Sequence, residues 1–146
     1  MKTAIIYYSK HHGNTKKLLD AMAGASEVTL IDVTQSPQTD LSSFDRIGLA
    51  SGIYLNKFAK QLLDYVQKYM PENKEVFYVY THGAPVVVLP KEIRAIVSDK
   101  KCKEVGAYHC RGFDTVGPFR FVGGIAKGHP TEKEINNAVK FIKELN

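Results

Sequence analysis

The sequence predicts a three-layer, doubly wound α/β fold, in which helices cover both faces of a five-stranded parallel sheet. Short apolar runs with strand character alternate with segments of helical spacing along the chain, and this alternation is typical of parallel sheets covered on both faces. The chain has 146 residues, of which 44% are hydrophobic and 24% are charged. It is therefore long enough to bury a core, and we expect a single domain over residues 1–146.

Five segments are predicted to be strands, because each is a short, largely apolar run flanked by polar residues. They are Thr3–Tyr8, Glu27–Val33, Phe44–Ser51, Lys74–Thr81 and Lys103–Cys110. The first is read as a strand rather than a signal peptide, since its apolar run is short and no small-residue cleavage site follows. No run approaches the roughly 20 apolar residues that span a bilayer. We therefore expect a cytoplasmic protein without a membrane span.

Four segments are predicted to be helices from their apolar spacing or their end signals: 14–24, 58–69, 90–98 and 131–145. Thr131 and Glu134 are three residues apart and predict a capping box at the last helix. Segments 52–57 and 111–130 are predicted to be loops, and segment 34–43 is predicted to be a loop or a poor helix.

The charge and the cysteines exclude several classes of function. The net charge is +5 and the pI is about 9.1, but the basic residues are spread out and carry no nucleic-acid motif. Cys102 and Cys110 would lie about 26 Å apart on one strand at about 3.3 Å per residue, too far for a disulfide. No metal-binding spacing is present, so no metal site is predicted.

The loop after the first predicted strand reads YSKHHGNTKK and leads directly into a helix. Unpaired N–H groups at a helix start carry partial positive charge and bind phosphates. Ser9, Asn14 and Thr15 would add polar groups, and Gly13 would allow a ligand to approach the backbone closely. The segment therefore indicates an anion site, most plausibly for a phosphate; the alternative is that Asn14 or Thr15 only caps the helix.

The loops after the third and fourth predicted strands would lie at the same edge of the sheet, where ligands bind in doubly wound folds. Tyr54 could stack on an aromatic ligand, or pack against neighbouring loops. The backbone of 81–84 could bond the polar edge of a ring, or form a turn without a ligand.

These three segments, in this order and in a chain of this length, resemble the flavodoxin family. They are a loop of type [ST]-x-x-x-G-N-T, the Gly and aromatic loop SGIY, and the Gly loop THGA. The resemblance implies a strand order of 2-1-3-4-5 and flavin mononucleotide (FMN) as the cofactor. By resemblance, Ser9, His11, His12, Gly13, Asn14 and Thr15 would hold the FMN phosphate, Ser51, Gly52, Ile53 and Tyr54 would line one side of the isoalloxazine ring, and Thr81, His82, Gly83 and Ala84 would reach its pyrimidine edge.

Three features depart from the family's usual pattern. The phosphate loop is one residue longer than the commonest S-x-T-G-N-T form, with His11 and His12 where Thr is usual. The chain is basic whereas electron-carrier flavodoxins are acidic, and a basic surface should make the flavin easier to reduce. Segment 111–130 is longer than a short-chain flavodoxin needs; Arg111, Phe113, Phe119 and Phe121 would suit a lid or a substrate wall, and a surface loop packed on its own aromatics is the alternative.

The leading functional hypothesis is electron transfer through non-covalently bound FMN, with a redox protein as partner. A small FMN-dependent oxidoreductase acting on a quinone is the alternative; the loop SGIYLNKF also resembles that of flavodoxin-like protoporphyrinogen dehydrogenases. A scaffold that has lost FMN is a third possibility. A phospho-accepting response regulator shares this fold class but needs acidic residues where this chain has Ser9–Lys10 and Ala50–Ser51.

Overall fold

The computed structural model describes residues 1–9, 13–35, 39–85, 87–113 and 124–145. Its elements, in chain order, are β1 (Thr3–Tyr8), α1 (Asn14–Ala25), β2 (Val28–Asp32), β3 (Arg46–Tyr54), β4 (Lys57–Phe58), α2 (Lys60–Tyr69), β5 (Glu75–His82), α3 (Lys91–Asp99), β6 (Lys103–Arg111) and α4 (Glu132–Leu145). The five long strands are parallel, in the order β2-β1-β3-β5-β6. The predicted fold class and the predicted order of the five strands are both confirmed.

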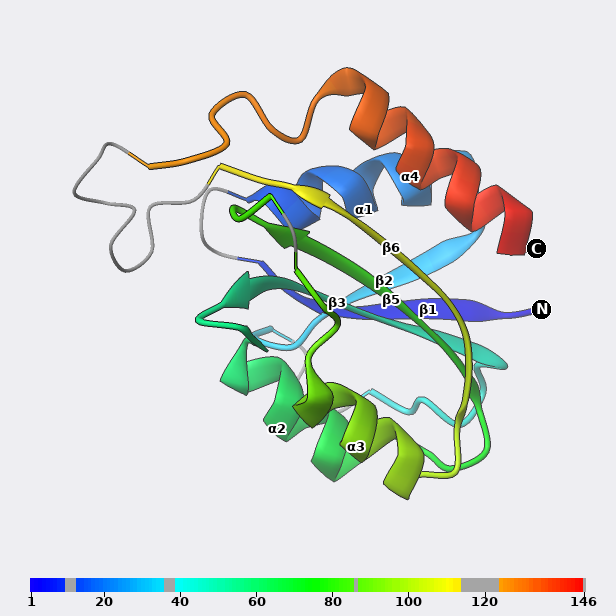
Figure 1. Cartoon of the computed structure of the whole chain (residues 1–146). Helices are drawn as coiled ribbons and strands as arrows, with labels where there is room; N and C mark the ends of the chain where they lie inside the picture. Colours follow the sequence, from blue (N-terminus) through cyan, green and yellow to red (C-terminus); the bar gives the residue numbers. More distant parts are fainter. Residues whose placement is uncertain (10–12, 36–38, 86, 114–123, 146) are drawn as a thin grey trace.

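The helices lie in two layers, α1 and α4 on one face of the sheet and α2 and α3 on the other (Figure 1). Successive side chains of a strand point to opposite faces, so the central strands feed two cores. Ile5 of β1 packs in the cluster that contains Leu18 of α1, whereas the next residue, Ile6, packs in the cluster that contains Leu62 of α2. This two-sided burial explains why the central strands read as nearly continuous apolar runs. None of the described helices is long and apolar enough to cross a membrane.

Gly48 leaves room on one face of the sheet for a buried aromatic ring. A Cβ at this position would lie 2.5 Å from Cζ of Phe77 and 3.0 Å from Cγ1 of Ile5. Phe77 is fully buried, with 0% of its surface exposed. The absent side chain of Gly48 therefore makes the room in which the Phe77 ring packs.

The segment predicted as the loop 52–57 is instead a β-hairpin. β3 continues to Tyr54, and β4 returns antiparallel to it with Ile53 opposite Phe58. The two residues at the tip, Leu55 and Asn56, have φ angles of 50° and 68°, the left-handed pair that a tight hairpin turn requires. The predicted helix start at Phe58 is wrong for the same reason, because Phe58 belongs to β4 and α2 begins at Lys60.

The pairing of β5 with β6 contains one irregularity. Val76 pairs with Glu104, but Phe77 pairs with Gly106, so Val105 is an extra residue in β6. From there the register runs without interruption and places Tyr80 opposite His109. Such a bulge changes which residue stands opposite which in the rest of the strand.

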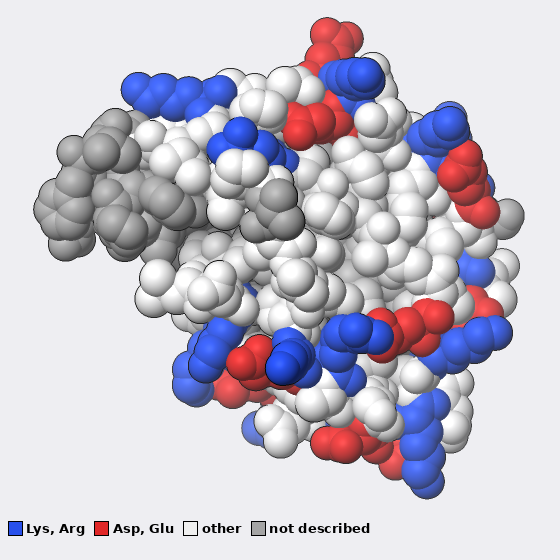
Figure 2. Space-filling model, in the orientation of Figure 1, with Lys and Arg blue, Asp and Glu red and all other residues white. Residues whose placement is uncertain are grey.

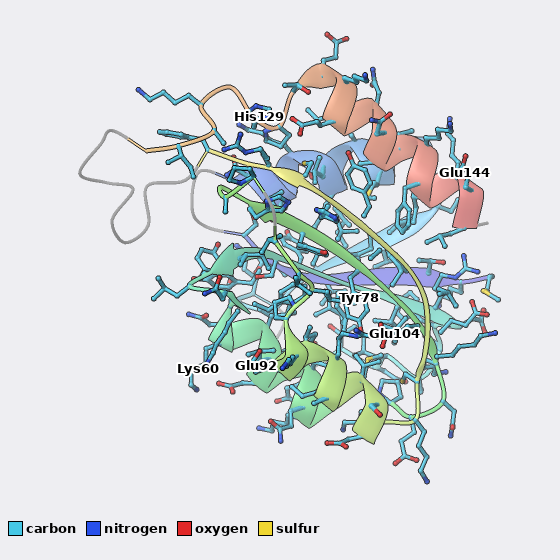
Figure 3. The ribbon with its side chains drawn as sticks, viewed as in Figure 1. Lys60, Tyr78, Glu92, Glu104, His129 and Glu144 are labelled. Carbon is cyan, nitrogen blue, oxygen red and sulfur yellow. The ribbon has the colours of Figure 1, made fainter. Side chains whose placement is uncertain are left out.

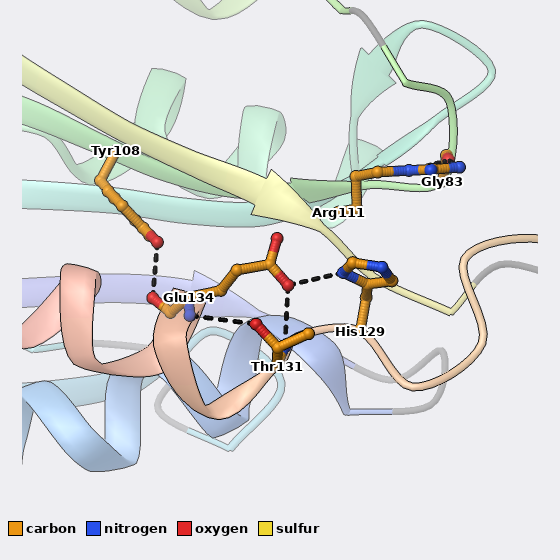
Figure 4. Close-up of polar contacts among 6 residues, drawn as sticks. All are labelled: Gly83, Tyr108, Arg111, His129, Thr131 and Glu134. Carbon is orange, nitrogen blue, oxygen red and sulfur yellow. Dashed lines mark hydrogen bonds and ion pairs between the residues drawn. The ribbon is translucent and has the colours of Figure 1, made fainter.

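The predicted capping box of the last helix is confirmed (Figure 4). The N–H of Glu134 donates to Oγ1 of Thr131 at 3.2 Å, and the N–H of Thr131 donates to Oε1 of Glu134 at 2.8 Å. Pro90 does not form the first turn of its helix as predicted but lies directly before α3, which begins at Lys91. Cys102 and Cys110 are free, as expected.

Candidate functional site

A crevice lies at the carboxyl ends of the central strands. Its lining comes from the start of α1, the β3–β4 hairpin, the end of β5 and the residues after β6: Ser9, Asn14, Thr15, Gly52, Ile53, Tyr54, Thr81, His82, Gly83, Gly112 and Phe113. The structure thus brings residues from all three predicted loops to one place.

The other residues predicted for the site lie around this crevice or outside the described residues. Gly13 precedes α1 directly. Ser51 is buried, its hydroxyl donates to the Gly52 carbonyl at 2.7 Å, and it accepts the N–H of Ala59 at 3.0 Å. The Ser51 hydroxyl therefore both donates and accepts a hydrogen bond at the hairpin, so we expect a ligand to contact the main chain of Ser51 rather than its side chain. The predictions for His11, His12, Phe119 and Phe121 fall outside the residues that the structure describes.

Among the described residues, the N–H groups of Asn14 and Thr15 in the first turn of α1 have no hydrogen-bond partner. Gly13 is the N-cap in the left-handed conformation, with φ at 64°, and as a glycine it has no side chain with which to cap the helix. The first bond of the helix runs from the Lys17 N–H to the Gly13 carbonyl, and the Lys16 N–H donates to Oγ of Ser9 at 3.1 Å. A helix leaves its first N–H groups without intrahelical partners; here Asn14 and Thr15 contribute such groups at the crevice. The Ser9 hydroxyl, which accepts from Lys16, can still donate its own proton.

Asn14 and Thr15 do not cap the helix; their side chains reach other elements. Oγ1 of Thr15 lies 3.0 Å from Oγ1 of Thr81 on β5, with both residues buried. One hydroxyl must donate to the other, so the acceptor's proton remains for a further partner. Nδ2 of Asn14 donates to the Phe113 carbonyl at 2.8 Å, while its Oδ1 is buried without a partner among the described residues. A buried unpaired acceptor is costly, and a ligand hydroxyl or N–H at this point would remove that cost.

Gly112 was not identified from the sequence, where it is one glycine of a glycine-rich segment. A Cβ at this position would lie 2.6 Å from Nδ2 of Asn14. Its N–H donates to the His82 carbonyl at 2.9 Å. Gly112 therefore holds the residues after β6 close to both α1 and β5, and the sequence gives no signal for this contact.

Tyr54 covers part of the crevice wall. A Cβ at Gly52 would lie 3.1 Å from both Cζ and the hydroxyl oxygen of Tyr54, so the ring folds back over the glycine. The ring of Tyr8 meets the Tyr54 ring edge to face at a centroid distance of 6.4 Å. A flat ligand ring that entered here would meet the ring of Tyr54.

Arg111 at the end of β6 holds the loop that follows β5. Nε and Nη2 of Arg111 both donate to the Gly83 carbonyl, at 3.1 and 2.7 Å, and Figure 4 shows the guanidinium reaching along this carbonyl. Nδ1 of His82 lies 2.6 Å from the Ala84 carbonyl, and its Nε2 lies 2.9 Å from Nδ1 of His109. Burial lowers the pKa of both His82 and His109.

A second hollow adjoins the crevice and shares Asn14 and Phe113 with it; its other lining residues are Lys17, Lys127, Gly128, His129 and Pro130. Nδ1 of His129 lies 2.6 Å from Oε1 of Glu134. Burial would raise the pKa of Glu134, but hydrogen bonds from Thr131 and His129 outweigh it and lower that pKa. The Glu134 carboxylate thus offsets part of the positive charge at this hollow.

The charges near the crevice are mixed in sign. Figure 3 shows Lys60 and Glu92, at the starts of α2 and α3, toward the end of the molecule that holds the crevice, with Glu144 at the opposite end. Lys60 pairs with Asp64 at 2.7 Å and Lys57 with Glu92 at 3.9 Å. Among the described residues on the face in Figure 2, basic and acidic side chains are mixed, without a large patch of one sign. The excess of positive charge is therefore not gathered into one docking surface on this face.

The sequence of this chain is similar to those of known proteins. A family model described as "Flavodoxin domain" matches residues 5–82. An uncharacterized protein of Methanocaldococcus jannaschii is 32% identical over 147 residues, which cover 99% of this chain and 98% of that protein.

Solved structures of several proteins share the fold. A flavodoxin from the domain Archaea superposes with a TM-score of 0.70 at 16% identity, over 99% of this chain and 96% of that one. A Fusobacterium nucleatum flavodoxin bound to flavin mononucleotide gives 0.69 at 14% identity, over 99% and 97%. An NADPH-quinone reductase from P. pentosaceus gives 0.67 at 16% identity, over 97% and 98%.

Proposed function

The chain belongs to the flavodoxin domain family, and from this we propose that it binds FMN non-covalently in the crevice and transfers electrons through it. The observation that carries the proposal is the convergence of the three strand-end segments on one crevice, where Oδ1 of Asn14 is buried without a partner among the described residues. Bound FMN would supply the redox chemistry, while the protein binds it, orients it and sets its electrostatic surroundings.

The donor set at the start of α1 fits a phosphate. The N–H groups of Asn14 and Thr15 belong to the first turn, where the helix dipole favours a negative charge. The hydroxyls of Ser9 and of the Thr15–Thr81 pair can add donors beside them. The buried Oδ1 of Asn14 needs a donor rather than a phosphate oxygen, and a ribityl hydroxyl of FMN could provide it.

The opposite part of the crevice fits the polar edge and the face of a ring. Arg111 holds the Gly83 carbonyl and thereby fixes the main chain of the loop after β5. Tyr54 lies on the hairpin at the other wall and would either stack on the ring or move aside for it. The protein's part is to orient the ring and to exclude water from it.

A second role, as a small oxidoreductase acting on a quinone or a protoporphyrinogen-type aromatic, is supported by another hollow beside the hairpin. It shares Tyr54 with the crevice and is otherwise lined by Tyr8, Leu55, Lys57, Phe58, Ala59, Lys60 and Gln61. Leu55 is 74% exposed at its rim. Apolar and aromatic side chains beside a bound flavin would suit a flat substrate.

The test of the proposed function is an absorbance spectrum of the purified protein before and after FMN is added and free FMN is removed. Flavin bands that remain with the protein support the proposal, and a protein that retains no FMN contradicts it and favours a scaffold that has lost the cofactor. Reductive titration then separates the two roles. A stable one-electron-reduced stage supports an electron carrier, and its absence together with quinone turnover supports an enzyme.

Replacement of Tyr54 by alanine is expected to weaken FMN binding by about 1–3 kcal/mol, roughly 5- to 150-fold, because stacking on an aromatic ring is lost. The Tyr54→Phe variant keeps the ring and should bind FMN like the original protein. Fluorescence quenching of FMN measures both dissociation constants. If the alanine variant binds equally or more tightly, Tyr54 only covers the crevice and has to move aside for the ligand.

A further inference from the structure

His82 and His109 form a hydrogen-bonded pair that connects the crevice with the surface. His82 is 6% exposed and lines the crevice, whereas His109 is exposed on β6. Nε2 of His82 and Nδ1 of His109 are 2.9 Å apart. Tyr80 stacks on the His109 ring at 4.8 Å with an interplanar angle of 10°, which fixes the orientation of that ring.

The partners determine where the protons lie when both rings are neutral. The Ala84 carbonyl can only accept, so the short contact at 2.6 Å puts a proton on Nδ1 of His82. Nε2 of a neutral His82 is then an acceptor and needs a donor. Nδ1 of His109 must therefore carry its proton, and Nε2 of His109 is a lone pair left to exchange protons with solvent.

This arrangement accepts one proton without moving a heavy atom. A proton added at Nε2 of His109 allows the proton on Nδ1 to pass to Nε2 of His82, and every hydrogen bond of the pair is kept. The positive charge then lies on His82, at the crevice. A second proton would put two N–H groups face to face at 2.9 Å, which breaks the contact. The pair therefore takes up a single proton and titrates as one unit.

The groups around the pair favour its neutral form. Burial lowers the pKa of His82, the Ala84 carbonyl raises it, and the neighbouring His109 and Arg111 of β6 lower it; Glu134 of α4 raises it. Burial also lowers the pKa of His109, against which Tyr80 lies. A new negative charge at the crevice would act in the opposite direction, since an anion favours the protonated form of a nearby imidazole.

We propose that the His82–His109 pair takes up one proton from solvent when FMN bound in the crevice is reduced, and so offsets the negative charge that reduction adds. The inference rests on the proposed binding of FMN. The electrons come from the redox partner, or from dithionite in an assay; the proton comes from water through Nε2 of His109, and no covalent bond to FMN forms. His109 acts through His82 and is a positioning residue, not a catalytic one.

The pair itself is tested first by ¹⁵N NMR of the histidine rings in the protein without FMN. We expect Nδ1 of both rings to be protonated at neutral pH, and a single joint titration step on acidification. Independent titration of the two rings, or the opposite tautomer of His109, would overturn the proposal without reference to any cofactor.

The coupling is tested with the FMN-bound protein. In the original protein, reduction of FMN by dithionite should add one proton to the pair, visible as a shift of the ring nitrogens of both His82 and His109. Unchanged ring shifts on reduction would overturn the coupling while leaving FMN binding intact. A protein that binds no FMN would overturn both this inference and the proposed function.

The variant His109→Gln gives the matched control, because its side-chain amide can donate to His82 as the neutral imidazole does but cannot take up a proton. The readout is the ratio of the dissociation constants of oxidised and reduced FMN, measured across pH with free FMN as reference. Consider the pH range in which the pair becomes protonated. There, each unit fall in pH should raise the ratio of the dissociation constants of oxidised and reduced FMN by up to about tenfold more in the original protein than in the variant. Equal pH dependence in both proteins would contradict the inference.

Discussion

Replacement of Thr15 by valine is expected to weaken FMN binding by about 1–3 kcal/mol, roughly 5- to 150-fold. Valine keeps the shape of threonine and removes the hydroxyl, so the change acts on hydrogen bonding at the start of α1. The hydroxyl lies 3.0 Å from that of Thr81 and, with it, can donate to a phosphate oxygen. Equilibrium titration of the protein with FMN, followed by fluorescence, measures the effect.

The same substitution should lower the free energy of unfolding by about 1–2 kcal/mol, because the buried Thr81 hydroxyl loses its described partner. In the double variant Thr15→Val/Thr81→Val, both hydroxyls are gone and part of that stability should return, whereas FMN affinity should not. Thr29→Val, at an exposed position of β2, is the control and should leave both quantities unchanged. A Thr15→Val protein that binds FMN with the original dissociation constant would remove Thr15 from the site.

Replacement of Gly48 by alanine is expected to lower the free energy of unfolding by about 2–3 kcal/mol, the range for overpacking a filled core. The new methyl group would lie 2.5 Å from the ring of Phe77 and 3.0 Å from Ile5. Both side chains are fully buried, so neither can move without disturbing the packing around it. Urea denaturation measures the change.

Gly24→Ala is the matched control for this substitution. Gly24 is exposed in α1, and a Cβ there would meet nothing within 4 Å. Alanine in a helix interior is favoured over glycine by about 0.5–1 kcal/mol, so this variant should be more stable than the original protein. If Gly48→Ala proved as stable as the original protein, the Phe77 ring would be able to repack, and its packing would not require a glycine at position 48.

The fold was largely predictable because hydrophobic runs and helical spacing report burial directly. The hairpin at Tyr54 was missed for a local reason: a tight turn with two left-handed residues usually contains glycine, and here Leu55 and Asn56 occupy those positions. The sequence between β3 and α2 therefore lacks the glycine that usually marks such a turn, and its apolar residues looked like the exposed part of a loop.

The candidate site was predictable to the level of segments but not of contacts. The position of the three loops follows from the topology, since parallel strands end at one edge. The bridges from Asn14 to Phe113 and from Thr15 to Thr81 join residues 99 and 66 positions apart, and no local pattern encodes them. His109 was not a candidate, because its place beside His82 depends on the register of β6 rather than on any motif.

Because Val105 is an extra residue in β6, it determines which residues in the rest of that strand stand opposite β5. With the bulge, His109 stands opposite Tyr80; in a frame without it, Tyr108 would take that place and His109 would point to the other face of the sheet. One inserted or deleted residue near the start of this edge strand would thus exchange the side chain that stands opposite Tyr80 and beside His82. Among relatives of this protein, a length difference near Val105 should accordingly coincide with a change in the chemistry of the crevice, although every residue of the other strands stays the same.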